Sequence, residues 1–369
     1  MMWTLLACTG SAPSPPPPDP PPSNPSGLTP YVVHVPAHVT PMPVPADNPL
    51  TVEGVALGRY LFYDPLLSGD DDFACASCHL QRYAFTDGLP RAVGTYGEPV
   101  QRNTMALINL AWEERFFWEG RASTLEEQVL IPIQDPRELA QDLPTLLDEL
   151  RAHPDYPARF QAAFPGQPLN EETLAKALAQ FVRALVSFDA PIDRLRDDAY
   201  ALSPLEQRGT DLLSMTLPQG DPDGVPDLCN ECHDQHRGVR QPAEADMMGL
   251  FSDARFRNSG LEAPAVDPGR EAVTGDPADR GRFRVPTIRN IAVTGPYMHD
   301  GRFATLEEVL HHYNEHLVDS GNLDPLLQRD GAPLRLNLSD DDIAAMVAAL
   351  KLFTDEGFLT DPRFSDPYR

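Results

Sequence analysis

One five-residue motif occurs twice in this chain, as CASCH at residues 75–79 and as CNECH at residues 229–233. The two copies contain four of the five cysteines. Two thiols one helical turn apart can bond to the two vinyl groups of one porphyrin, and the histidine that follows places an imidazole under its iron. The pattern predicts two covalently bound c-type haems. The predicted residues are Cys75, Cys78 and His79 for the first haem and Cys229, Cys232 and His233 for the second.

Two other interpretations of these cysteine pairs are weaker. A zinc site made from two C-x-x-C pairs would not require a histidine directly after both of them. A thioredoxin-like redox pair is expected within a β-α-β pattern, which this sequence lacks. Because c-type haem attachment takes place outside the bacterial cytoplasm, the motifs also predict an exported protein.

A longer repeat surrounds these motifs. Residues 120–127 read GRASTLEE and residues 301–308 read GRFATLEE, and the two starting positions, 120 and 301, differ by 181. In each copy a threonine stands at an expected helix N-cap and a glutamate follows three residues later, as in a capping box. These pairs are Thr124 with Glu127 and Thr305 with Glu308. Related segments, RNTMALIN and RVPTIRN, precede the two copies in the same order, which indicates a duplicated module.

Helical periodicity dominates the remaining sequence. Residues 170–188 and 339–353 repeat apolar residues at helical spacing behind a plausible N-cap, Asn170 or Ser339. The expected buried faces are Leu174, Leu178, Phe181, Leu185 and Phe188 in the first segment and Ile343, Met346, Val347, Leu350 and Phe353 in the second. No convincing run of alternating strand residues is found. We therefore expect a mainly α protein with long loops, and 369 residues are enough for two separate cores.

The formal net charge of −26 restricts the partners. Nucleic acid is disfavoured because its phosphates would be repelled. A basic partner would be attracted, although acidic surfaces are common among proteins.

The N-terminus resembles the start of a bacterial lipoprotein. Residues 5–8 read LLAC, as in a lipoprotein cleavage box, with Cys8 as the lipid-modified residue. The apolar region is short and no Lys or Arg precedes it, which a truncated or misassigned start would explain; the alternative is that LLAC is accidental. Residues 9–50 hold 15 of the 40 prolines, a composition typical of an extended spacer. No later apolar run reaches membrane-spanning length. The lipobox, the spacer and the haem motifs together lead us to expect a periplasmic or cell-envelope protein attached through Cys8.

From about residue 50 to residue 355 the chain resembles the bacterial dihaem cytochrome c peroxidase family, and within it the MauG-like branch. Besides the two C-x-x-C-H motifs, the resemblance rests on FFWEGR at 116–121, RFRVPTIRNIAVTGPYMHDGR at 282–302 and LEEVLHHYN at 306–314. It implies two tandem cytochrome c-type domains that face each other. The expected units are a signal or lipobox segment (1–8), a Pro-rich linker or stalk (9–50), a first domain with the peroxide-reactive haem (51–198), a second with the electron-relay haem (199–356) and a C-terminal tail (357–369).

The resemblance also implies three residues that serve the first haem. Gln128 follows Trp118 by ten residues and Glu138 follows Gln128 by ten more, as in the family pattern. Glu138 is implied as the acid–base group for peroxide and Gln128 as a hydrogen-bond partner of the bound ligand or water. Trp118 is implied as the charge relay between the haems. Without the family, Glu138 is an ordinary helix-terminal carboxylate, Gln128 a solvated polar residue and Trp118 a core aromatic.

The peroxidases proper can close the first haem with a second histidine from a loop. Between His79 and Trp118 this chain has no histidine. The first haem is therefore expected to be open, as in the MauG-like branch, without reductive activation.

The second haem departs from the peroxidase pattern at its other axial ligand. Peroxidases have a methionine fourteen residues after the histidine of their P-Y-x-H-D-G signature, whereas here Tyr313 stands fourteen residues after His299. A thioether favours ferrous iron, while a hard phenolate favours ferric and higher states. The resemblance to the MauG-like branch implies Tyr313 as the ligand. The alternatives are Met298, His311, His312 and His316, or a core role for Tyr313.

The resemblance further implies a calcium ion at the domain interface. The matching residues are Asn103, Thr294 and Pro296, whose oxygen donors suit a hard cation but which are also ordinary turn residues. His299 is expected near a propionate of the second haem, without a catalytic role.

Three functions follow. The leading one is a dihaem c-type oxidoreductase that uses hydrogen peroxide at the first haem and shares oxidising equivalents through Trp118 with a Tyr313-ligated second haem, to oxidise a reductant or protein substrate. A cytochrome c peroxidase fed by a small cytochrome is the alternative enzyme, against which Tyr313 and the missing loop histidine count. A dihaem electron carrier without substrate chemistry is the alternative from another class.

Overall fold

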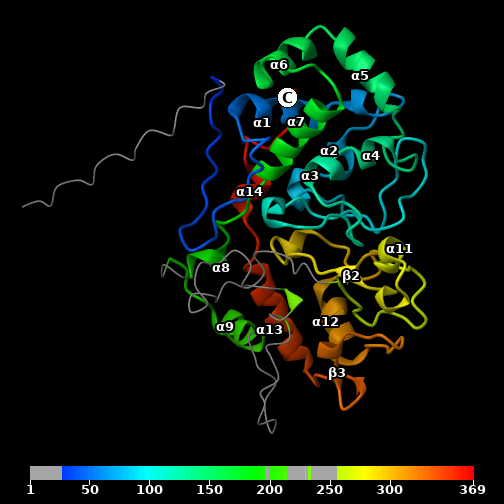
Figure 1. The fold of residues 1–369 in the computed structure, drawn as a ribbon. Helices are drawn as coiled ribbons and strands as arrows, with labels where there is room; N and C mark the ends of the chain where they lie inside the picture. The colour runs from blue at the N-terminus through cyan, green and yellow to red at the C-terminus, as the bar shows by residue number, and fades with distance from the viewer. Residues whose placement is uncertain (1–26, 196–198, 214–228, 230–231, 234–255) are drawn as a thin grey trace, which may run out of the picture.

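The computed structural model describes residues 27–195, 199–213, 229, 232–233 and 256–369, which form two mainly helical halves, one stacked on the other (Figure 1). In the first half lie α1 (Val52–Tyr63), α2 (Cys75–Cys78), α3 (Leu125–Gln128), α4 (Ile131–Gln134), α5 (Leu143–Ala152), α6 (Tyr156–Ala163) and α7 (Glu171–Ala184). The second half contains α8 (Pro191–Arg194), α9 (Pro204–Leu213), α11 (Glu271–Thr274), α12 (Leu306–Glu315) and α13 (Asp340–Lys351), and α14 (Glu356–Thr360) follows.

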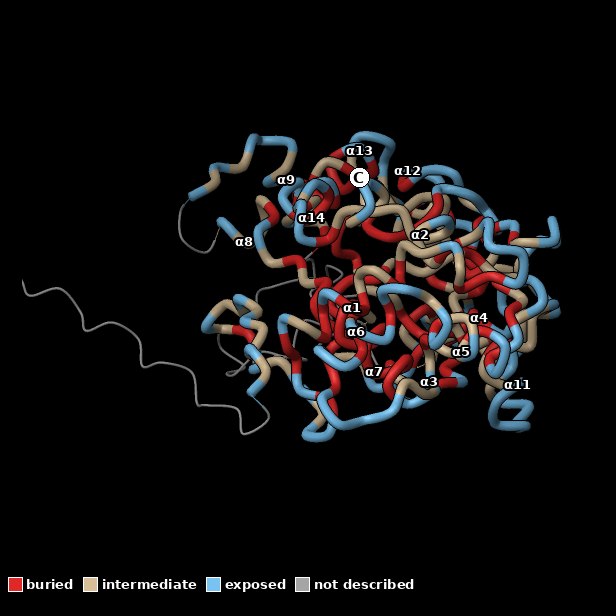
Figure 2. Tube along the Cα trace, turned by 90° about the horizontal axis from the view of Figure 1, so that it is seen from above, coloured by how far each residue is buried: buried red, intermediate tan, exposed pale blue. Residues whose placement is uncertain are grey.

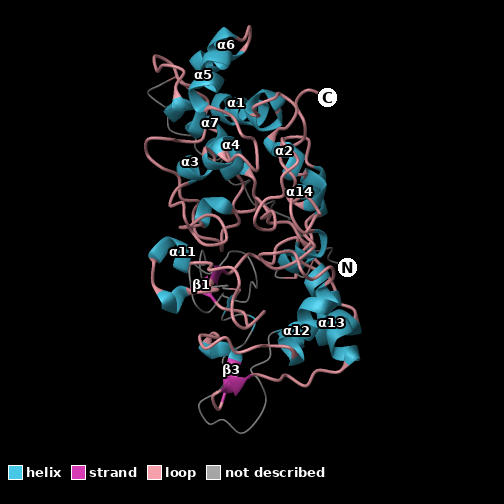
Figure 3. Ribbon diagram, turned by 90° about the vertical axis from the view of Figure 1, so that its right-hand side faces the viewer, coloured by secondary structure: helices cyan, strands magenta, loops and turns pink. Residues whose placement is uncertain are grey.

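Strands are very short in the described part of the chain, as expected (Figure 3). β1 (Phe256–Arg257) pairs antiparallel with β2 (Phe283–Arg284), and Phe256 faces Arg284 in the register. β3 (Gln328–Arg329) pairs antiparallel with β4 (Ala332–Pro333). Within the described ranges, no helix is both long and apolar enough to span a bilayer.

The two long helices predicted from periodicity are confirmed. The Asn170 side chain accepts a hydrogen bond from the Thr173 N–H at the start of α7, and the Ser339 side chain accepts one from the Asp342 N–H at the start of α13. Nine of the ten predicted face residues are buried, and the tenth, Phe188, packs with Val39 in a small satellite cluster. α7 packs on α1 in the first core and α13 packs on α9 in the second. Much of α7 and of α13 is buried, as the red parts of the tube show in Figure 2.

The duplicated module is visible in the backbone. Asn109 and Asn290, which differ by 181 in number, both adopt a left-handed conformation, with φ of 55° and 56°. The same offset relates Phe117 to Met298, with φ of 65° and 72°. It also relates the bridges Phe116–Ala122 and Tyr297–Phe303. Two segments of different sequence thus follow the same unusual path, which supports duplication over coincidence.

A buried polar network joins the two halves. The Ser187 backbone N–H donates to Asn109 Oδ1 at 2.9 Å, and the Ser187 hydroxyl donates to Asp355 Oδ2 at 2.9 Å. Asn290 donates from Nδ2 to the Ser187 hydroxyl at 3.1 Å and accepts the Asp355 N–H at 2.8 Å. All four residues are buried. The corresponding asparagines of the two modules therefore both bond to Ser187, and Asp355 bonds to Ser187 and to Asn290.

Residues 27–50 do not form a free spacer, which corrects the C-terminal part of the predicted linker 9–50. Asn48 is 1 % exposed and accepts a hydrogen bond from Gln180 of α7 at 2.9 Å. Trp112 donates from its indole nitrogen to the Thr40 carbonyl at 3.1 Å. These contacts hold the segment against the first half. The predicted signal or lipobox segment 1–8, its Cys8 and the PPPP-rich stretch lie outside the described residues.

The expected C-terminal tail 357–369 is also part of the folded body. Phe358 and Phe364 are 3 % exposed and belong to the first hydrophobic core. The Tyr63 hydroxyl of α1 donates to the Phe364 carbonyl at 2.7 Å. After α13 the chain therefore returns from the second half to the first, as the red segment through α14 shows in Figure 1.

Candidate functional site

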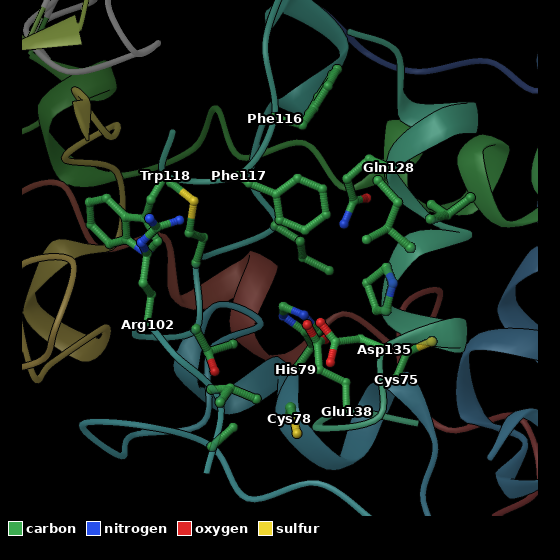
Figure 4. Close-up of a pocket in the computed structure, with 18 of the residues that line it drawn as sticks. Cys75, Cys78, His79, Arg102, Phe116, Phe117, Trp118, Gln128, Asp135 and Glu138 are labelled. Carbon is green, nitrogen blue, oxygen red and sulfur yellow. The ribbon is translucent and has the colours of Figure 1, made fainter. Parts of the chain in front are cut away.

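The first C-x-x-C-H motif borders a cavity of about 530 Å³, within the usual size range of ligand sites. Cys75, Cys78 and His79 line it, together with Gln128 and Glu138. In the view of Figure 4, Phe117 and Gln128 lie above His79 and the two cysteines, with the cavity between them. Residues that the sequence separates by up to 63 positions, from 75 to 138, thus surround one space.

The ring of His79 is oriented by one backbone hydrogen bond. Its Nδ1 lies 2.6 Å from the Phe85 carbonyl oxygen, which can only accept, so Nδ1 carries the proton. Nε2 is then the unprotonated nitrogen, as a metal ligand requires. Burial lowers the pKa of His79, although the Phe85 hydrogen bond opposes this effect, and the ring is kept neutral. This orientation suits a proximal haem ligand.

Cys75 and Cys78 lie at the two ends of the one-turn helix α2 and both line the cavity. Burial raises the pKa of each thiol to about 12. A reactive redox pair needs a lowered thiol pKa, so these residues do not fit that alternative. Half-buried thiols one turn apart beside an oriented imidazole fit the covalent attachment of haem, and Cys75, Cys78 and His79 would hold it.

Glu138 stands in the cavity wall with an unusual acidity. Burial and, to a smaller extent, the nearby Asp135 raise the pKa of its carboxyl to about 7, against the opposing effect of Arg121. Its backbone is fixed on both sides, because its N–H donates to the Asp135 carbonyl at 2.9 Å and its carbonyl accepts from Thr95 at 2.9 Å. A carboxyl group with a pKa close to neutrality can both take up and release a proton at physiological pH.

Gln128 is held at the C-terminal end of α3. The Thr124 side chain caps this helix by accepting from the Glu127 N–H at 3.0 Å, and the Gln128 N–H donates to the Thr124 carbonyl at 3.0 Å. The Glu127 carboxylate accepts from the N–H of Ser123, one residue before the cap, so the capping box of this copy is shifted. In the second copy Thr305 and Glu308 form the full box.

The second C-x-x-C-H motif borders another cavity, of about 230 Å³. Cys229, Cys232 and His233 line it. His233 Nδ1 lies 2.9 Å from the Pro286 carbonyl oxygen, which assigns the same tautomer as in His79. The two histidines are thus oriented in the same way, and Cys229, Cys232 and His233 would hold the second haem.

Tyr313 projects from α12 into the second cavity. Burial and the neighbouring Cys232 and Cys229 strongly raise the pKa of its phenol, while a hydrogen bond with Ser259 opposes the shift. The phenol is therefore protonated unless a cation replaces its proton.

The alternative ligands named from the sequence lie in different places. Met298 also lines the second cavity. The histidines are not among its lining residues: His312 donates from Nε2 to the Ser259 carbonyl at 2.9 Å, His311 lies 4.0 Å from Glu315 and His316 contacts the His311 carbonyl at 3.0 Å. Of the five candidates, Tyr313 and Met298 are the two in the cavity wall.

Trp118 lines both cavities. Its Nε1 donates to the Asn103 carbonyl at 2.8 Å, and its own carbonyl accepts from the Arg284 N–H at 2.7 Å. The indole meets the rings of Phe283 and His299 edge-on, each at 6.5 Å between centroids. The indole is thus fixed between the two attachment motifs.

The residues implied for calcium lie around the second cavity. Asn103, Thr294 and Pro296 are all in its wall. The Asn103 side chain donates from Nδ2 to the Leu89 carbonyl at 2.9 Å, which turns Oδ1 to the other side. In the described residues no group of three or more His, Cys, Asp or Glu is arranged for a metal ion, so a calcium site here would depend on amide and carbonyl oxygens.

A charged frame between the cavities was not foreseen. Arg102 binds Asp267 through two hydrogen bonds of 2.8 Å and also pairs with Glu119, which pairs in turn with Arg121. A second ion pair joins Arg284 to Glu113 at 2.9 Å, with both side chains 5 % exposed. Glu119 and Arg121 belong to the FFWEGR segment at 116–121, on which the family resemblance rests in part. Their partners come from other parts of the chain, which local spacing does not reveal.

Comparison with known proteins relates this chain to one family of haem proteins. Residues 52–200 match the family model for di-haem cytochrome c peroxidase. The chain is 36 % identical over 314 residues to the methylamine utilization protein MauG of Methylorubrum extorquens, covering 84 % of this chain and 81 % of that protein. It is 32 % identical over 334 residues to the cytochrome-c peroxidase IdrP1 of a Pseudomonas species, covering 86 % and 85 %.

A solved structure also resembles this fold. The crystal structure of a MauG-like protein associated with microbial copper homeostasis superimposes with a TM-score of 0.78 at 35 % identity. The match covers 92 % of this chain and 100 % of that one.

Proposed function

This chain belongs to the di-haem cytochrome c peroxidase family and is a haem peroxidase-type oxidoreductase, and we propose that within the family it works as a MauG-like enzyme. The observation that carries this proposal is Tyr313, which lines the cavity of the second attachment motif while the three neighbouring histidines do not. When bound, the two haems would supply peroxide activation and the storage of oxidising equivalents. The side chains around both cavities would handle protons, bind ligands and transfer charge in this chemistry.

Glu138 is the proton-handling group of the first cavity. With a pKa of about 7 it exists in both protonation states near neutrality. It can therefore take a proton from one peroxide oxygen and return it to the other. Gln128 supplies an amide in the same cavity for hydrogen bonding to the ligand or to water.

The loop between His79 and Trp118 offers the first cavity no second histidine ligand besides His79, because its sequence contains no histidine. Its one sulfur ligand candidate, Met105, accepts a hydrogen bond from Arg284 at 3.7 Å. These observations support an open coordination position in the first cavity, which the MauG-like role requires.

Tyr313 sets the character of the second cavity. A phenol oxygen that exchanges its proton for a cation becomes a hard anionic donor, which stabilises ferric and higher oxidation states. A site of this kind is suited to sharing an oxidising equivalent and poorly suited to holding a spare electron.

Trp118 carries charge between the cavities. Its indole proton is held by the Asn103 carbonyl, a group that accepts a hydrogen bond but is too weak a base to take the proton. Loss of one electron would therefore leave Trp118 as a cation that keeps its N–H. No proton has to move, so the relay is reversible in both directions.

The remaining assignments complete the proposal. Calcium would be held by Asn103, Thr294 and Pro296, which all line the second cavity, and Asn103 lines the first cavity as well. Attachment through Cys8 would keep the enzyme in the periplasm or at the cell envelope. The substrates would be hydrogen peroxide and either a reductant or a protein substrate oxidised at the surface.

A second candidate function is a cytochrome c peroxidase that takes electrons from a small cytochrome, favoured by the 32 % identity to IdrP1. A plain dihaem electron carrier is the non-enzymatic candidate. The electron paramagnetic resonance spectrum of the oxidised holoprotein, followed by peroxide titration, separates the three. One high-spin and one low-spin haem that react with peroxide without prior reduction support the MauG-like role. A requirement for prior reduction supports the peroxidase, and two low-spin haems without a peroxide reaction support the carrier.

A further inference from the structure

The C-terminal segment brings an exposed tyrosine onto α1. Tyr368 is 54 % exposed, and its ring meets Tyr60 edge-on at 5.3 Å between centroids. The segment is anchored nearby, because Arg59 donates from Nε to the Ser365 carbonyl at 2.6 Å. Tyr368 therefore has a defined position at the surface although it is the penultimate residue.

Two phenols share one carboxylate at this place. Asp64 Oδ2 accepts from the Tyr368 hydroxyl at 2.9 Å and also from the hydroxyl of Tyr156. The two phenol oxygens lie 3.2 Å apart. Asp64 Oδ1 accepts from the Leu66 N–H at 3.0 Å, which fixes the carboxylate. Tyr156 is only 2 % exposed, so the pair consists of one buried and one solvent-facing phenol.

Aromatic side chains extend from this pair to the first attachment motif. Phe62 lies 6.3 Å from the His79 ring and 5.4 Å from the Tyr63 ring, between centroids. Tyr63 and Tyr60 are three residues apart in α1 and so lie on the same side of the helix. Tyr60 contacts Tyr368 as described. Ring contacts thus join His79 to Tyr63 through Phe62 and join Tyr60 to the surface residue Tyr368, and one turn of α1 separates Tyr63 from Tyr60. This route to the surface runs away from Trp118.

We propose that the Asp64, Tyr156 and Tyr368 cluster is a second redox-active site, at which oxidising equivalents generated from peroxide in the first domain reach solvent. Tyr368 loses one electron through the aromatic side chains of α1 to the oxidised first domain, which is reduced by one electron. The phenolic proton passes to the Asp64 carboxylate, which leaves a neutral tyrosyl radical beside a neutral carboxylic acid. The proposal rests on the peroxide-using activity and not on the identity of the second haem's ligand.

The charges around each aromatic residue decide which residue finally holds the radical. The Arg159 guanidinium lies 3.6 Å from the centroid of the Tyr60 ring, where it opposes positive charge. Tyr368 has a carboxylate that accepts its proton, so its oxidation leaves a neutral pair and creates no positive charge. Trp118 differs from Tyr368, because its partner is a carbonyl that cannot accept a proton. The exposed Tyr368 is therefore the favoured end of the route.

The exposed phenol of Tyr368 indicates the chemical class of the external electron donor. A small phenolic reductant at the surface would give one electron to the Tyr368 radical and release its own proton to solvent. Asp64 would return its proton to Tyr368, which restores the starting state. Two such events consume the two oxidising equivalents of one peroxide and yield two phenoxyl radicals.

The test uses the holoprotein labelled with ring-deuterated tyrosine, mixed with hydrogen peroxide and frozen within seconds for electron paramagnetic resonance. We expect a tyrosyl radical whose hyperfine pattern changes with the label. Tyr368→Phe should lose most of this signal, and Asp64→Asn should lose it too because an amide cannot accept the proton. With hydroquinone as the probe, the wild-type radical should decay faster as the probe concentration rises.

Tyr200→Phe is the matched control, since Tyr200 also donates to a carboxylate, Glu206, at 2.9 Å. It belongs to the second half and should leave the signal unchanged. A tyrosyl signal that survives Tyr368→Phe, or no tyrosyl signal in a wild-type protein whose haem absorbance responds to peroxide, would overturn the relay. A wild-type protein whose haem absorbance does not respond to peroxide would overturn both the relay and the function proposed above. Haem content measured for each variant reports folding.

Discussion

The indole N–H of Trp118 donates to the backbone carbonyl of Asn103 at 2.8 Å, and both residues line both cavities. One hydrogen bond therefore fixes the aromatic ring that stands between the two attachment motifs. It also ties that ring to a residue implied in calcium binding.

Replacing Trp118 should stop the transfer of oxidising equivalents between the two haems. In Trp118→Phe we expect both haems to be present, but after peroxide addition the absorbance of the second haem should no longer change together with that of the first. A phenylalanine ring is much harder to oxidise than an indole. Stopped-flow absorbance spectroscopy measures the two responses.

Trp112→Phe is the control for this prediction. Trp112 also donates its indole N–H to a carbonyl, that of Thr40, but it is not among the residues lining either cavity. If Trp118→Phe keeps the coupled response, the relay does not run through this residue.

Glu138→Gln should slow the reaction with peroxide by roughly 10²–10⁴-fold while haem content stays intact, as expected for the loss of a general acid–base group. In the wild type, the ionised carboxylate accepts the first proton. Burial raises the pKa of Glu138 to about 7, so the carboxyl is protonated and inactive at low pH and becomes active as the pH rises through about 7. The rate of the first peroxide reaction should follow this rise.

In Glu138→Gln the rate should be low and independent of pH over the same range. The exposed Glu171→Gln in the first turn of α7 should retain both the wild-type rate and its pH profile. An unchanged rate in Glu138→Gln would remove Glu138 from its role.

Tyr313→Met should raise the reduction potential of the second haem, because a thioether favours ferrous iron over ferric iron. A shift on the order of 100 mV would be ordinary within the roughly 0.8 V over which axial ligands set haem potentials. Potentiometric titration of the holoprotein measures it. His316→Gln, which changes an exposed histidine of the same cluster, should leave the potential unaltered, and the absence of any shift in Tyr313→Met would exclude Tyr313 as a ligand.

Asp355→Ala should destabilise the contact between the two halves. It removes the acceptor of the Ser187 hydroxyl and of the Asp189 N–H, at 2.9 and 3.1 Å, in a buried place. Leaving buried donors unpaired costs about 1–3 kcal/mol. Denaturant unfolding of the holoprotein should show this loss, whereas Asp148→Ala, whose ion pair with Arg151 is largely exposed, should change the free energy of unfolding very little.

Cys8→Ala should release the protein from membranes if the N-terminus is that of a lipoprotein. Membrane fractionation of the producing cells, with immunodetection of the chain, measures the distribution. A variant that stays in the membrane fraction as the wild type does would contradict attachment through Cys8.

Much of the local structure was predictable because it depends on near neighbours in the chain. The apolar spacing behind Asn170 and Ser339 identified α7 and α13, together with the faces that they bury. The order of repeated motifs identified the duplication that the backbone of Asn109 and Asn290 confirms. These features follow from helical periodicity and from capping, which operate within a few residues.

The long-range contacts were not predictable in this way. Nothing in the proline-rich segment before residue 50 indicates that Asn48 packs on α7, and nothing in the last residues indicates that Tyr368 reaches Asp64. Such contacts depend on how the two halves fold back on each other, and many alternative pairings of polar residues are compatible with the same composition.

The sequence by itself determined the chemistry, since two C-x-x-C-H motifs specify covalent haem attachment through the spacing of atoms within one helical turn. The tertiary structure alone decided which distant side chains share a cavity with those motifs. It brought Glu138 into a wall that raises its pKa, turned His312 toward Ser259 and left Tyr313 facing the second cavity. The physical reason is that burial and side-chain orientation are properties of the packed chain, and no short stretch of residues contains them.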